Sequence, residues 1–502
     1  MSQIYKTFEL AKTGYPIPIF QSGKPMHSKY NPEKEAETFV QNISKSDFFI
    51  ILGIGGGFHI QKLAETFPKS KIIGVEFSCE DIDFLKQHSP ICKNLAKKEN
   101  VIFTSLTLLE KTICENWITA VFPSLSIIEY KSWTIENANI TEKIKKIIRE
   151  TISKISADYS VQVHFGKIWM HNILNNLKYN VKKSLKFSDI KIIKNEKAIV
   201  LAAGPSLDSK IKYLKENSNI CTIISTDTAY KTLLQHNINV DFVCSVDAQN
   251  VSTVHFLGKN NNPNTTFIFD LTSNPSAPKK LLKDGQKVVF TNSGHPLISY
   301  IESICEKNFF EKLQTGSGTV TIAALDFAKK LGFSNIEILG ADFSYPNAKP
   351  YCKGTYLEQT FTPKINKFSP IETFYNKLMF RTKLIKINKY ATTEILNSYK
   401  ISFETWLFEN KFQYKNENFV YFAKKNSCKT EQKIFHNFDY EDFKKRLQNE
   451  LFVEKNHNTN PFFLTNFEKS MLPYISYLQE KKKIKDFAQL LNLALYDFVR
   501  YT

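Results

Sequence analysis

The chain has 502 residues, 42% of them apolar, so it is long enough for two to four domains and too apolar for a disordered protein. Its 67 Lys and Arg residues outnumber 49 Asp and Glu residues, giving a formal net charge of +18. A basic surplus can serve nucleic acid, an anionic membrane or an acidic substrate. The sequence has no block of five consecutive basic residues and no nucleic-acid-binding motif, so we expect no nucleic-acid partner.

The eight cysteines are scattered without a C-x-x-C pair, which is typical of reduced thiols and disfavours a disulfide framework or a zinc site. The first residues contain no apolar signal core, and no run of about 18 apolar residues occurs. We therefore predict a cytoplasmic protein without membrane insertion and without a bound metal. The sequence indicates no oligomeric state.

A glycine-rich loop follows the first strongly apolar segment. Phe48–Leu52 predicts a buried strand and Gly53–Gly57 a tight loop. A helix over Ile60–Phe67 and a strand over Lys71–Glu76 complete a β-α-β unit. Glu76 ends that strand, where a carboxylate would reach the ribose hydroxyls of a nucleotide or of S-adenosylmethionine. The alternative is a glycine turn that only lets strand and helix pack closely. We expect no catalytic cofactor here, because the other chemistry-bearing residues follow residue 200.

After a helical stretch from about residue 135 to 183, a second β-α unit begins. Lys197–Ala203 predicts a strand that runs into Gly204, Pro205 and Ser206. In this turn the glycine lets the backbone approach a ligand, the proline starts a helix, and the serine offers a hydroxyl group. The strands that follow end in polar side chains, namely Asp227, Asp247, Asp270 and His295.

The stretch from Thr315 to Tyr351 is the most informative part of the chain. A loop of two glycines and two hydroxyls precedes a helix: Thr315, Gly316, Ser317 and Gly318. The helix should end at Gly332, and a strand over Ile336–Leu339 should lead to Asp342, Tyr345 and Tyr351. Loops at the carboxyl ends of parallel strands form ligand crevices, and a helix N-terminus favours an anion. This stretch therefore predicts an anionic-ligand site.

The remaining residues, 401–502, show helical periodicity and no chemical motif, as a helical cap or interaction module would. Three domains are therefore expected. They are an N-terminal Rossmann-like α/β domain with a long helical bridge (1–185), a nucleotide-binding domain (186–400) and a helical domain (401–502).

Three segments of the second domain resemble a known family: Ala202–Leu207, Ser225–Gln249 and Thr315–Pro346. They are similar to the motility accessory factor (Maf) family, glycosyltransferase-like proteins implicated in modifying bacterial flagellin with nonulosonic acids. The upstream segments ILGIGGGFH and HFGKIWMHNILNNL extend the resemblance over most of the chain. The second domain also resembles bacterial sialyltransferases that use CMP-sialic acid. It has their G-P-S-L loop, a T-G-S-G loop that resembles their T-S-G loop, their G-x-D-F strand end and their pair of tyrosines six residues apart.

The resemblance implies an α/β fold in which a central Rossmann-like parallel sheet is preceded by a smaller Rossmann-like domain and followed by a helical one. It implies that Gly204, Pro205 and Ser206 line the nucleotide, and that the loop from Thr315 to Gly318 holds cytidine and its phosphate. Tyr345 and Tyr351 would steady the departing phosphate.

Two departures from the sialyltransferase pattern leave the general base open. Asp227 and Asp247 stand where those enzymes present asparagines. Their catalytic histidine, expected downstream of the tyrosines, has no counterpart between Tyr351 and Phe435. The base is then absent, supplied by His295, or replaced by a carboxylate such as Asp247 or Asp342.

Three functions remain open on this sequence. The first is transfer of a nonulosonic acid (pseudaminic, legionaminic or sialic acid type) from its CMP ester to Ser or Thr of flagellin, without a cofactor. Neutral hydroxyl donors can stabilise a leaving phosphate without a metal. The second is an ATP- and Mg²⁺-dependent 6-hydroxymethylpterin diphosphokinase, for which Asp227 and Asp247 suit Mg²⁺ better than asparagine would. The third is a non-catalytic chaperone that binds flagellin.

Overall fold

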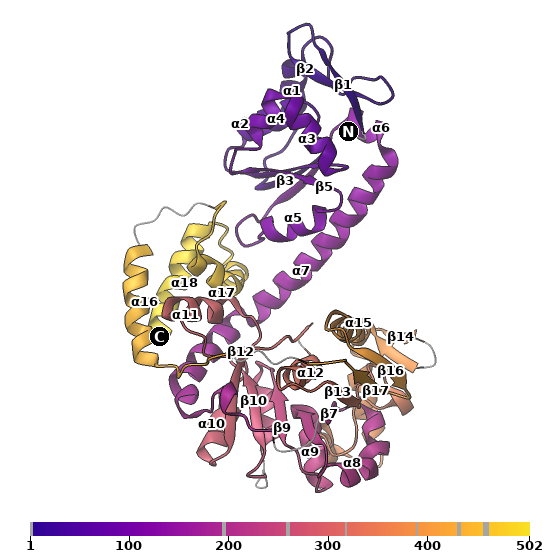
Figure 1. Cartoon of the computed structure of the whole chain (residues 1–502), viewed down its shortest axis with the longest axis vertical. Coiled ribbons are helices and arrows are strands. Elements are labelled where there is room, and N and C mark those ends of the chain that lie inside the picture. Colours follow the sequence, from indigo (N-terminus) through magenta and orange to yellow (C-terminus); the bar gives the residue numbers. More distant parts are fainter. Residues whose placement is uncertain are drawn as a thin grey trace. The chain divides into compact units, whose positions relative to one another are not determined.

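The computed structural model describes residues 4–192, 197–257, 262–316, 319–387, 390–428, 433–454 and 461–502, without the side chains of 451–454. Ser317 and Gly318 of the predicted anion-binding loop therefore lie outside the described residues. The chain forms two compact units (Figure 1). Unit 1 comprises Met1–Gly166 and Asn458–Phe498, and unit 2 comprises Lys167–His457 and Val499–Thr502.

These units differ from the predicted ranges 1–185, 186–400 and 401–502. The C-terminal residues form no separate domain, because they are divided between the two units.

Unit 1 is an α/β domain with a small antiparallel hairpin at its start. Its elements are β1 (Tyr5–Leu10), β2 (Pro16–Phe20), α1 (Pro32–Gln41), β3 (Phe48–Leu52), α2 (Phe58–Thr66), β4 (Lys71–Glu76), α3 (Cys79–His88), α4 (Pro90–Leu95), β5 (Val101–Ser105), α5 (Leu109–Asn116), β6 (Leu125–Glu129), α6 (Lys131–Glu136) and α17 (Asn466–Lys482). The long helix α7 (Ala138–Asn175) begins in it, and α18 (Phe487–Tyr501) lies largely in it.

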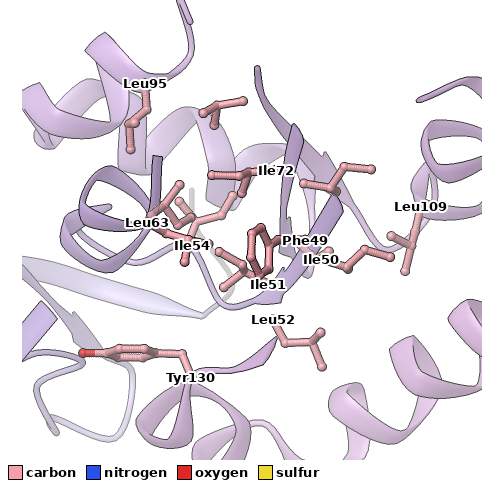
Figure 2. Close-up of a cluster of buried hydrophobic side chains, with 14 of the residues drawn as sticks. Phe49, Ile50, Ile51, Leu52, Ile54, Leu63, Ile72, Leu95, Leu109 and Tyr130 are labelled. Atoms are coloured by element: carbon pink, nitrogen blue, oxygen red, sulfur yellow. The ribbon is translucent and has the colours of Figure 1, made fainter. Parts of the chain in front are cut away.

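The core of unit 1 surrounds a parallel sheet with the strand order β5-β4-β3-β6. All five residues of β3 are fully buried, and Ile72 of β4 and Leu63 of α2 lie in the same cluster (Figure 2). A continuous apolar run is what a strand covered on both faces requires. Each such side chain contributes about 1.5–3 kcal/mol on burial. The predicted β-α-β unit is confirmed.

Unit 2 is built on a sheet of nine strands, accompanied by α-helices, a π-helix (η1) and short 3₁₀ helices. Its first elements are η1 (Asn176–Asn180), η2 (Val181–Lys183), η3 (Phe187–Asp189), β7 (Lys197–Leu201), η4 (Pro205–Lys210), α8 (Ile211–Asn217), β8 (Thr222–Thr226), α9 (Asp227–Gln235), β9 (Phe242–Ser245), η5 (Asn250–Phe256), β10 (Thr266–Asp270), α10 (Ser276–Lys283), β11 (Lys287–Asn292) and α11 (Pro296–Cys305). They are followed by β12 (Glu311–Lys312), α12 (Val320–Lys330), β13 (Asn335–Leu339), η6 (Pro346–Ala348), α13 (Tyr356–Phe361), η7 (Thr362–Lys364), α14 (Ile371–Met379), β14 (Leu384–Ile387), β15 (Tyr390–Thr393), α15 (Glu394–Glu409), β16 (Gln413–Glu417), β17 (Val420–Lys424) and α16 (Tyr440–Glu454).

The strand order of this sheet is β12-β11-β10-β9-β8-β7-β13-β17-β16, and the strands from β12 to β13 are parallel (Figure 1). Helix α12 packs on β7, β8 and β9, and all its residues from Ile322 to Ala328 are buried. The helix ends where predicted: Gly332 follows it at φ 97°, the left-handed region that favours glycine. The predicted Rossmann-like parallel sheet is confirmed.

The last hundred residues differ from the expectation of helices alone. Helices α16, α17 and α18 confirm the predicted helical segments. The hairpin β16–β17, however, extends the main sheet, with β17 antiparallel to β13. Val420, Tyr421 and Ala423 are buried against the sheet, and tertiary pairing overrides the weak local pattern. In the described part of the chain, no helix is both long and apolar enough to cross a bilayer.

Candidate active site

The loops after β7 and β13 meet at the carboxyl edge of the sheet. Strands β8 to β12 extend from one side of β7, whereas β13 lies on its other side. This reversal is the topological switch point at which open α/β sheets bind ligands. The predicted turn from Gly204 to Ser206 and the predicted strand end at Asp342 therefore face each other there.

Asp342 fastens these two loops together. Its Oδ2 accepts a hydrogen bond from the Ser206 backbone N–H at 2.8 Å, and its Oδ1 accepts one from the Ser206 hydroxyl. Burial raises the pKa of Asp342 to about 6, although the hydrogen bonds from Ser206 favour the charged form. Because both oxygens are engaged, Asp342 is placed to hold Ser206 rather than to take a proton from a substrate.

Two glycines make this close approach possible. A Cβ on Gly204 would overlap the Gly340 carbonyl oxygen and the Asp342 carboxylate. Gly340 itself has φ 73°, and a Cβ on it would overlap the Ala202 carbonyl oxygen. The backbone N–H of Gly204 donates to the Gly340 carbonyl at 2.8 Å, and Pro205 begins η4. The G-P-S and G-x-D segments are thus one structural feature.

Asp227 and Asp247 lie at the neighbouring strand ends. Asp227 is 2% exposed; its Oδ2 accepts from the Ser245 hydroxyl at 2.7 Å and its Oδ1 from the Thr228 N–H at 2.6 Å. Asp247 accepts from the Gln249 N–H at 2.9 Å. Burial raises the pKa of Asp247, and the nearby charge of Asp227 raises it further. The two acids therefore share one electrostatic environment.

The sequence reasoning missed His255, which joins this pair. His255 is 7% exposed in η5, and its Nδ1 has no hydrogen-bond partner in the described residues. Burial lowers its pKa, while the charges of Asp227 and Asp247 partly offset that shift. Its ring meets Tyr356 edge to face, with 4.7 Å between ring centres. A buried, neutral imidazole that senses the charge of two carboxylates has the properties of a general base.

The two predicted tyrosines interact with each other electrostatically, and Tyr351 also senses the charge of Asp227. Burial raises the pKa of Tyr351, with further contributions from Tyr356, Tyr345 and Asp227. Burial also raises the pKa of Tyr345. The hydroxyls of Tyr345 and Tyr351 donate no hydrogen bond to any other residue that the structure describes. Both phenols remain protonated donors at neutral pH, so they suit an incoming anion.

The backbone around these tyrosines is anchored. The Tyr345 N–H donates to the Ala391 carbonyl of β15 at 2.8 Å. After Tyr351, the Cys352 N–H donates to the Ala203 carbonyl at 2.9 Å. Fixed main chain on both sides lets the phenols act as preorganised donors.

Two cations influence the cluster electrostatically. Lys231 on α9 lowers the pKa of His255, and Arg381 lowers that of Tyr356. Positive charge near His255 and Tyr356 favours an anionic ligand at this edge.

His295 plays a structural part. It caps α11, since its Nδ1 accepts from the Leu297 N–H at 3.2 Å, and its ring packs edge to face on Trp169. Burial lowers its pKa to about 4. With Nδ1 accepting, the proton of the neutral ring sits on Nε2, so the cap must break before His295 can act as a base. The geometry favours His255 for that role.

Thr315 and Gly316 lie between β12 and α12, at the same edge of the sheet. Gly316 has φ 53°, and the Thr315 carbonyl accepts from the Thr319 N–H at 3.0 Å. No hydrogen bond joins Thr315 or Gly316 to the Asp227–His255 cluster in the described ranges. Their nucleotide-binding role stays a prediction, as does that of Ser317 and Gly318.

A series of asparagines at the end of α7 and in the π-helix η1 that follows it supports the acidic loops. The Asn172 amide donates to the carbonyls of Ala248 and Thr272 at 3.0 and 2.8 Å. Asn176 donates to two carbonyls of the loop after β10, and Asn180 donates to the Asn176 side chain at 2.8 Å. The spacing of four residues places these amides on one helix face. This spacing was the feature of the sequence that could have indicated their shared role.

In unit 1, the glycine-rich loop is filled by the protein itself. Glu76 accepts hydrogen bonds from the Tyr5 hydroxyl at 2.7 Å and the Trp133 indole at 2.9 Å. It also accepts from the N–H groups of Ile54 and Gly55 at 2.8 and 3.2 Å. Burial raises the pKa of Glu76 to about 7. All the positions from which it could contact a ribose are occupied.

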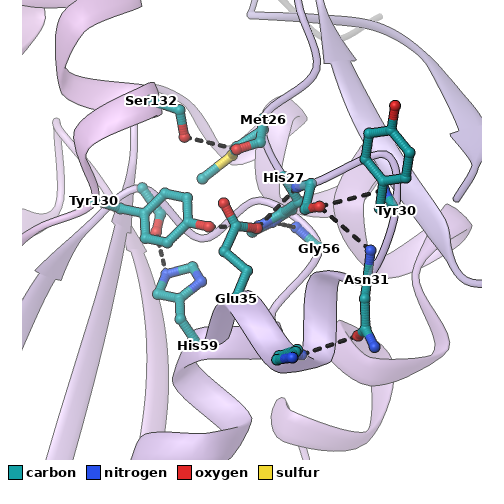
Figure 3. Close-up of polar contacts among 12 residues, drawn as sticks. Met26, His27, Tyr30, Asn31, Glu35, Gly56, His59, Tyr130 and Ser132 are labelled. Carbon is teal, nitrogen blue, oxygen red and sulfur yellow. Dashed lines mark hydrogen bonds and ion pairs between the residues drawn. The ribbon is translucent and has the colours of Figure 1, made fainter. Parts of the chain in front are cut away.

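Aromatic and histidine side chains close the rest of that loop (Figure 3). The Gly56 N–H donates to His27 Nε2 at 2.8 Å, and His27 Nδ1 lies 2.9 Å from the Tyr130 hydroxyl. A Cβ on Gly53 would overlap Trp133, and one on Gly55 would overlap Met26. The glycines here allow close packing, the alternative that the sequence left open. Across the described residues, no three His, Cys, Asp or Glu side chains are grouped to hold a metal ion.

Known proteins share parts of this sequence and this fold. Residues 171–348 match the family described as 6-hydroxymethylpterin diphosphokinase MptE-like. A Maf glycosyltransferase from Magnetospirillum magneticum AMB-1 superimposes with a TM-score of 0.51 and 13% sequence identity, covering 100% of this chain and 91% of that one. The chain has the fold of a Maf glycosyltransferase. The predicted resemblance is thus confirmed at the level of the fold.

Two curated sequence relatives are uncharacterized proteins, so they indicate no activity for this chain. An uncharacterized protein of Treponema pallidum (strain Nichols) is 41% identical over 143 residues, which are 28% of this chain and 50% of the relative. Another uncharacterized protein of that strain is 38% identical over 111 residues, 22% of this chain and 52% of the relative. The chain therefore spans about half the length of the curated relatives it matches.

Proposed function

We propose that the chain is a glycosyltransferase that moves a nonulosonic acid from its CMP ester to a Ser or Thr hydroxyl of flagellin, in the cytoplasm and without a cofactor. The observation that carries the proposal is the set of unpartnered phenols and the unpartnered imidazole at the carboxyl ends of β8, β9 and β13. The Maf-type fold around them supports a glycosyltransferase.

The phenols of Tyr345 and Tyr351 would stabilise the departing CMP. As the bond between the anomeric carbon and the phosphate oxygen breaks, negative charge builds on that phosphate. Preorganised donors aimed at developing charge are a large source of catalysis. Lys231 and Arg381 would add positive charge from the rim of the cluster.

His255 would act as the general base. Its neutral ring, within the electrostatic influence of Asp227 and Asp247, would take the proton of the acceptor hydroxyl as that oxygen attacks the anomeric carbon. A carboxylate beside the ring stabilises the imidazolium that forms. This fills the role that the sequence left without a histidine.

A second function draws on the family description and on the two acids. A 6-hydroxymethylpterin diphosphokinase would need ATP and Mg²⁺, and Asp227 and Asp247 are the carboxylates at the correct edge to bind the ion. Each acid already accepts hydrogen bonds from the protein, which favours the transferase.

The test is incubation of the purified protein with a CMP-nonulosonic acid and flagellin, followed by mass spectrometry of intact flagellin. The proposal expects a mass increase of one sugar and release of CMP. In parallel, the protein receives ATP, Mg²⁺ and 6-hydroxymethylpterin. AMP release in that reaction, with unmodified flagellin in the first, would favour the diphosphokinase. Flagellin binding without either product would favour the chaperone.

A further inference from the structure

A cavity lies beside the loop that follows β13. Its volume is about 440 Å³, and its floor includes Asp342, Phe343 and Ser344. The hairpins β14–β15 and β16–β17 and helix α15 contribute the remaining lining residues. None of the groups assigned above to phosphate stabilisation or proton transfer lines this cavity.

Three asparagines line it without internal partners. Asn397 comes from α15, Asn416 from β16 and Asn418 from the turn between β16 and β17. Their side-chain amides make no hydrogen bond with another described residue. A primary amide offers two donors and an acceptor, which matches the hydroxyl and N-acyl groups of a sugar.

Aromatic residues at the cavity are held in unusual backbone conformations. Phe419 has φ 67° and Phe343 has φ 48°, a region that bulky residues rarely adopt. Phe419 packs on Tyr390 with 4.9 Å between ring centres, so the β16–β17 hairpin contacts the β14–β15 hairpin there. Strain of this kind persists where surrounding structure enforces it, often at ligand sites. The exposed ring faces would pack on the C–H face of a sugar.

One cationic residue lines the cavity within the described part of the chain. Lys400 on α15 is half-buried, and its ammonium group lies 3.9 Å from the Glu404 carboxylate. That separation is at the limit of an ion pair, so Lys400 retains capacity for a second anion. A carboxylate-bearing ligand would complete its pairing.

We propose that this cavity binds an acidic sugar, with the carboxylate on Lys400, the polar substituents on the three asparagines and the ring against Phe419. The proposal rests on the proposed function in one respect, because it takes the sugar to be the nonulosonic acid that the enzyme transfers. It assigns the sugar a subsite separate from the phosphate-binding phenols.

The cavity is mechanically joined to the catalytic loop. The Thr392 hydroxyl donates to the Phe343 carbonyl at 2.7 Å, and the neighbouring Ala391 carbonyl accepts from Tyr345. Sugar bound here would therefore steady the segment that carries Tyr345 and Asp342. Recognition of the sugar and stabilisation of the leaving group would be coupled through β15.

The experiment uses the full-length protein and free N-acetylneuraminic acid, a nonulosonic acid, with binding followed by ligand-observed NMR. Wild-type protein should bind the free acid, and its methyl ester should bind about tenfold more weakly because it lacks the charge. Lys400→Gln should weaken the acid about tenfold and leave the ester unchanged. The matched control is Lys415→Gln, since Lys415 is the exposed neighbour of Asn416 on β16 and points to the opposite face.

Competition identifies the source of the sugar. Displacement of the free acid by a CMP-nonulosonic acid, but not by CMP, assigns the cavity to the donor sugar. Displacement only by glycosylated flagellin assigns it to sugar already attached to the acceptor. Absence of binding to wild type, or equal binding by wild type and Lys400→Gln, overturns the proposal even if transfer to flagellin is observed. Lys400-dependent binding without any transfer leaves this site standing and refutes the proposed function.

Discussion

Each unit has a glycine-containing turn after a buried strand, Gly53–Gly57 in unit 1 and Gly204–Ser206 in unit 2, yet the two turns differ in what surrounds them. In unit 1, Glu76 accepts four hydrogen bonds from Tyr5, Trp133 and the loop backbone. In unit 2, the edge beside Gly204 retains His255 Nδ1 and the hydroxyls of Tyr345 and Tyr351 without partners in the described chain.

Buried polar groups are normally paired, since an unpaired one costs about 1–3 kcal/mol. The Glu76 oxygens of unit 1 already have protein partners, whereas His255 Nδ1 and the two phenols of unit 2 can still form hydrogen bonds with an arriving ligand. A glycine turn after a buried strand therefore serves packing in unit 1 and, in our proposal, catalysis in unit 2.

The largest expected effect comes from His255. His255→Asn should lower the rate of transfer about 10²–10⁴-fold, because the acceptor hydroxyl loses its base. Burial lowers the pKa of His255 below its usual 6.5, so the wild-type rate should fall only when the pH drops below that pKa and the ring takes a proton. The variant should lose this acid limb. Initial rates across pH 4.5–8, released CMP being measured, check both outcomes.

The control for His255 is His295→Asn. An asparagine keeps a side-chain acceptor for the Leu297 N–H and preserves the helix cap. Turnover within a few fold of wild type is expected. A large loss in this folded variant, together with full activity in His255→Asn, would return the role of base to His295.

Tyr345→Phe and Tyr351→Phe should have the next largest effect. Each change removes one hydrogen bond to a charged phosphate, worth about 1.5–3 kcal/mol, so each should slow transfer about 10- to 100-fold. The retained rings should leave the melting temperature unchanged, and the double variant should lose transfer. Tyr179→Phe, at a tyrosine 54% exposed, is the control. Normal turnover by the double variant would remove both tyrosines from the mechanism.

Asp342→Asn separates positioning from proton transfer. An asparagine can accept from the Ser206 N–H and donate to the Ser206 hydroxyl oxygen, so both contacts survive with the hydroxyl reversed. We expect turnover within a few fold and an unchanged melting temperature. If the rate instead falls 100-fold or more in a protein of normal stability, about 2.7 kcal/mol of transition-state stabilisation, Asp342 takes part in the chemistry.

Glu76→Gln should have the smallest effect on turnover. The side-chain oxygen of the glutamine would take the place of Oε1, which accepts most of the hydrogen bonds. Its NH₂ group would then take the place of Oε2 and face the Trp133 indole N–H, so that two hydrogen-bond donors would oppose each other. Unfolding of unit 1 should become easier by about 1–3 kcal/mol, while transfer stays within a few fold. Thermal denaturation beside the transfer assay measures the two effects. Glu9→Gln, at an exposed ion pair with Lys29, is the control and should change neither.

Much of the fold could be predicted from the sequence because many elements are indicated by the residues of a short local segment. Apolar runs such as Phe48–Leu52 and the glycine after α12 indicate their elements directly, and strand ends at Asp227, Asp247 and Asp342 indicate one edge of a sheet. The β16–β17 hairpin did not follow, because its pairing with β13 depends on residues far away in the chain.

The candidate site was only partly predictable for a similar reason. Glu76 looked like a ribose ligand because its partners, Tyr5 and Trp133, are distant in sequence. His255 carries no motif, and only the fold brings it within the electrostatic influence of Asp227 and Asp247. A histidine a few residues beyond a strand-end acid was the one available signal.

The central claim is that the open edge of unit 2, and not the closed loop of unit 1, binds the nucleotide. Isothermal titration calorimetry of CMP, S-adenosylmethionine and NAD against the full-length wild type, the Tyr345→Phe/Tyr351→Phe double variant and Glu76→Gln tests it most directly. We predict that CMP binds the wild type and Glu76→Gln equally and the double variant at least tenfold more weakly, and that neither S-adenosylmethionine nor NAD binds. Binding of S-adenosylmethionine or NAD that Glu76→Gln abolishes, or CMP binding unaffected by the double change, would contradict the account.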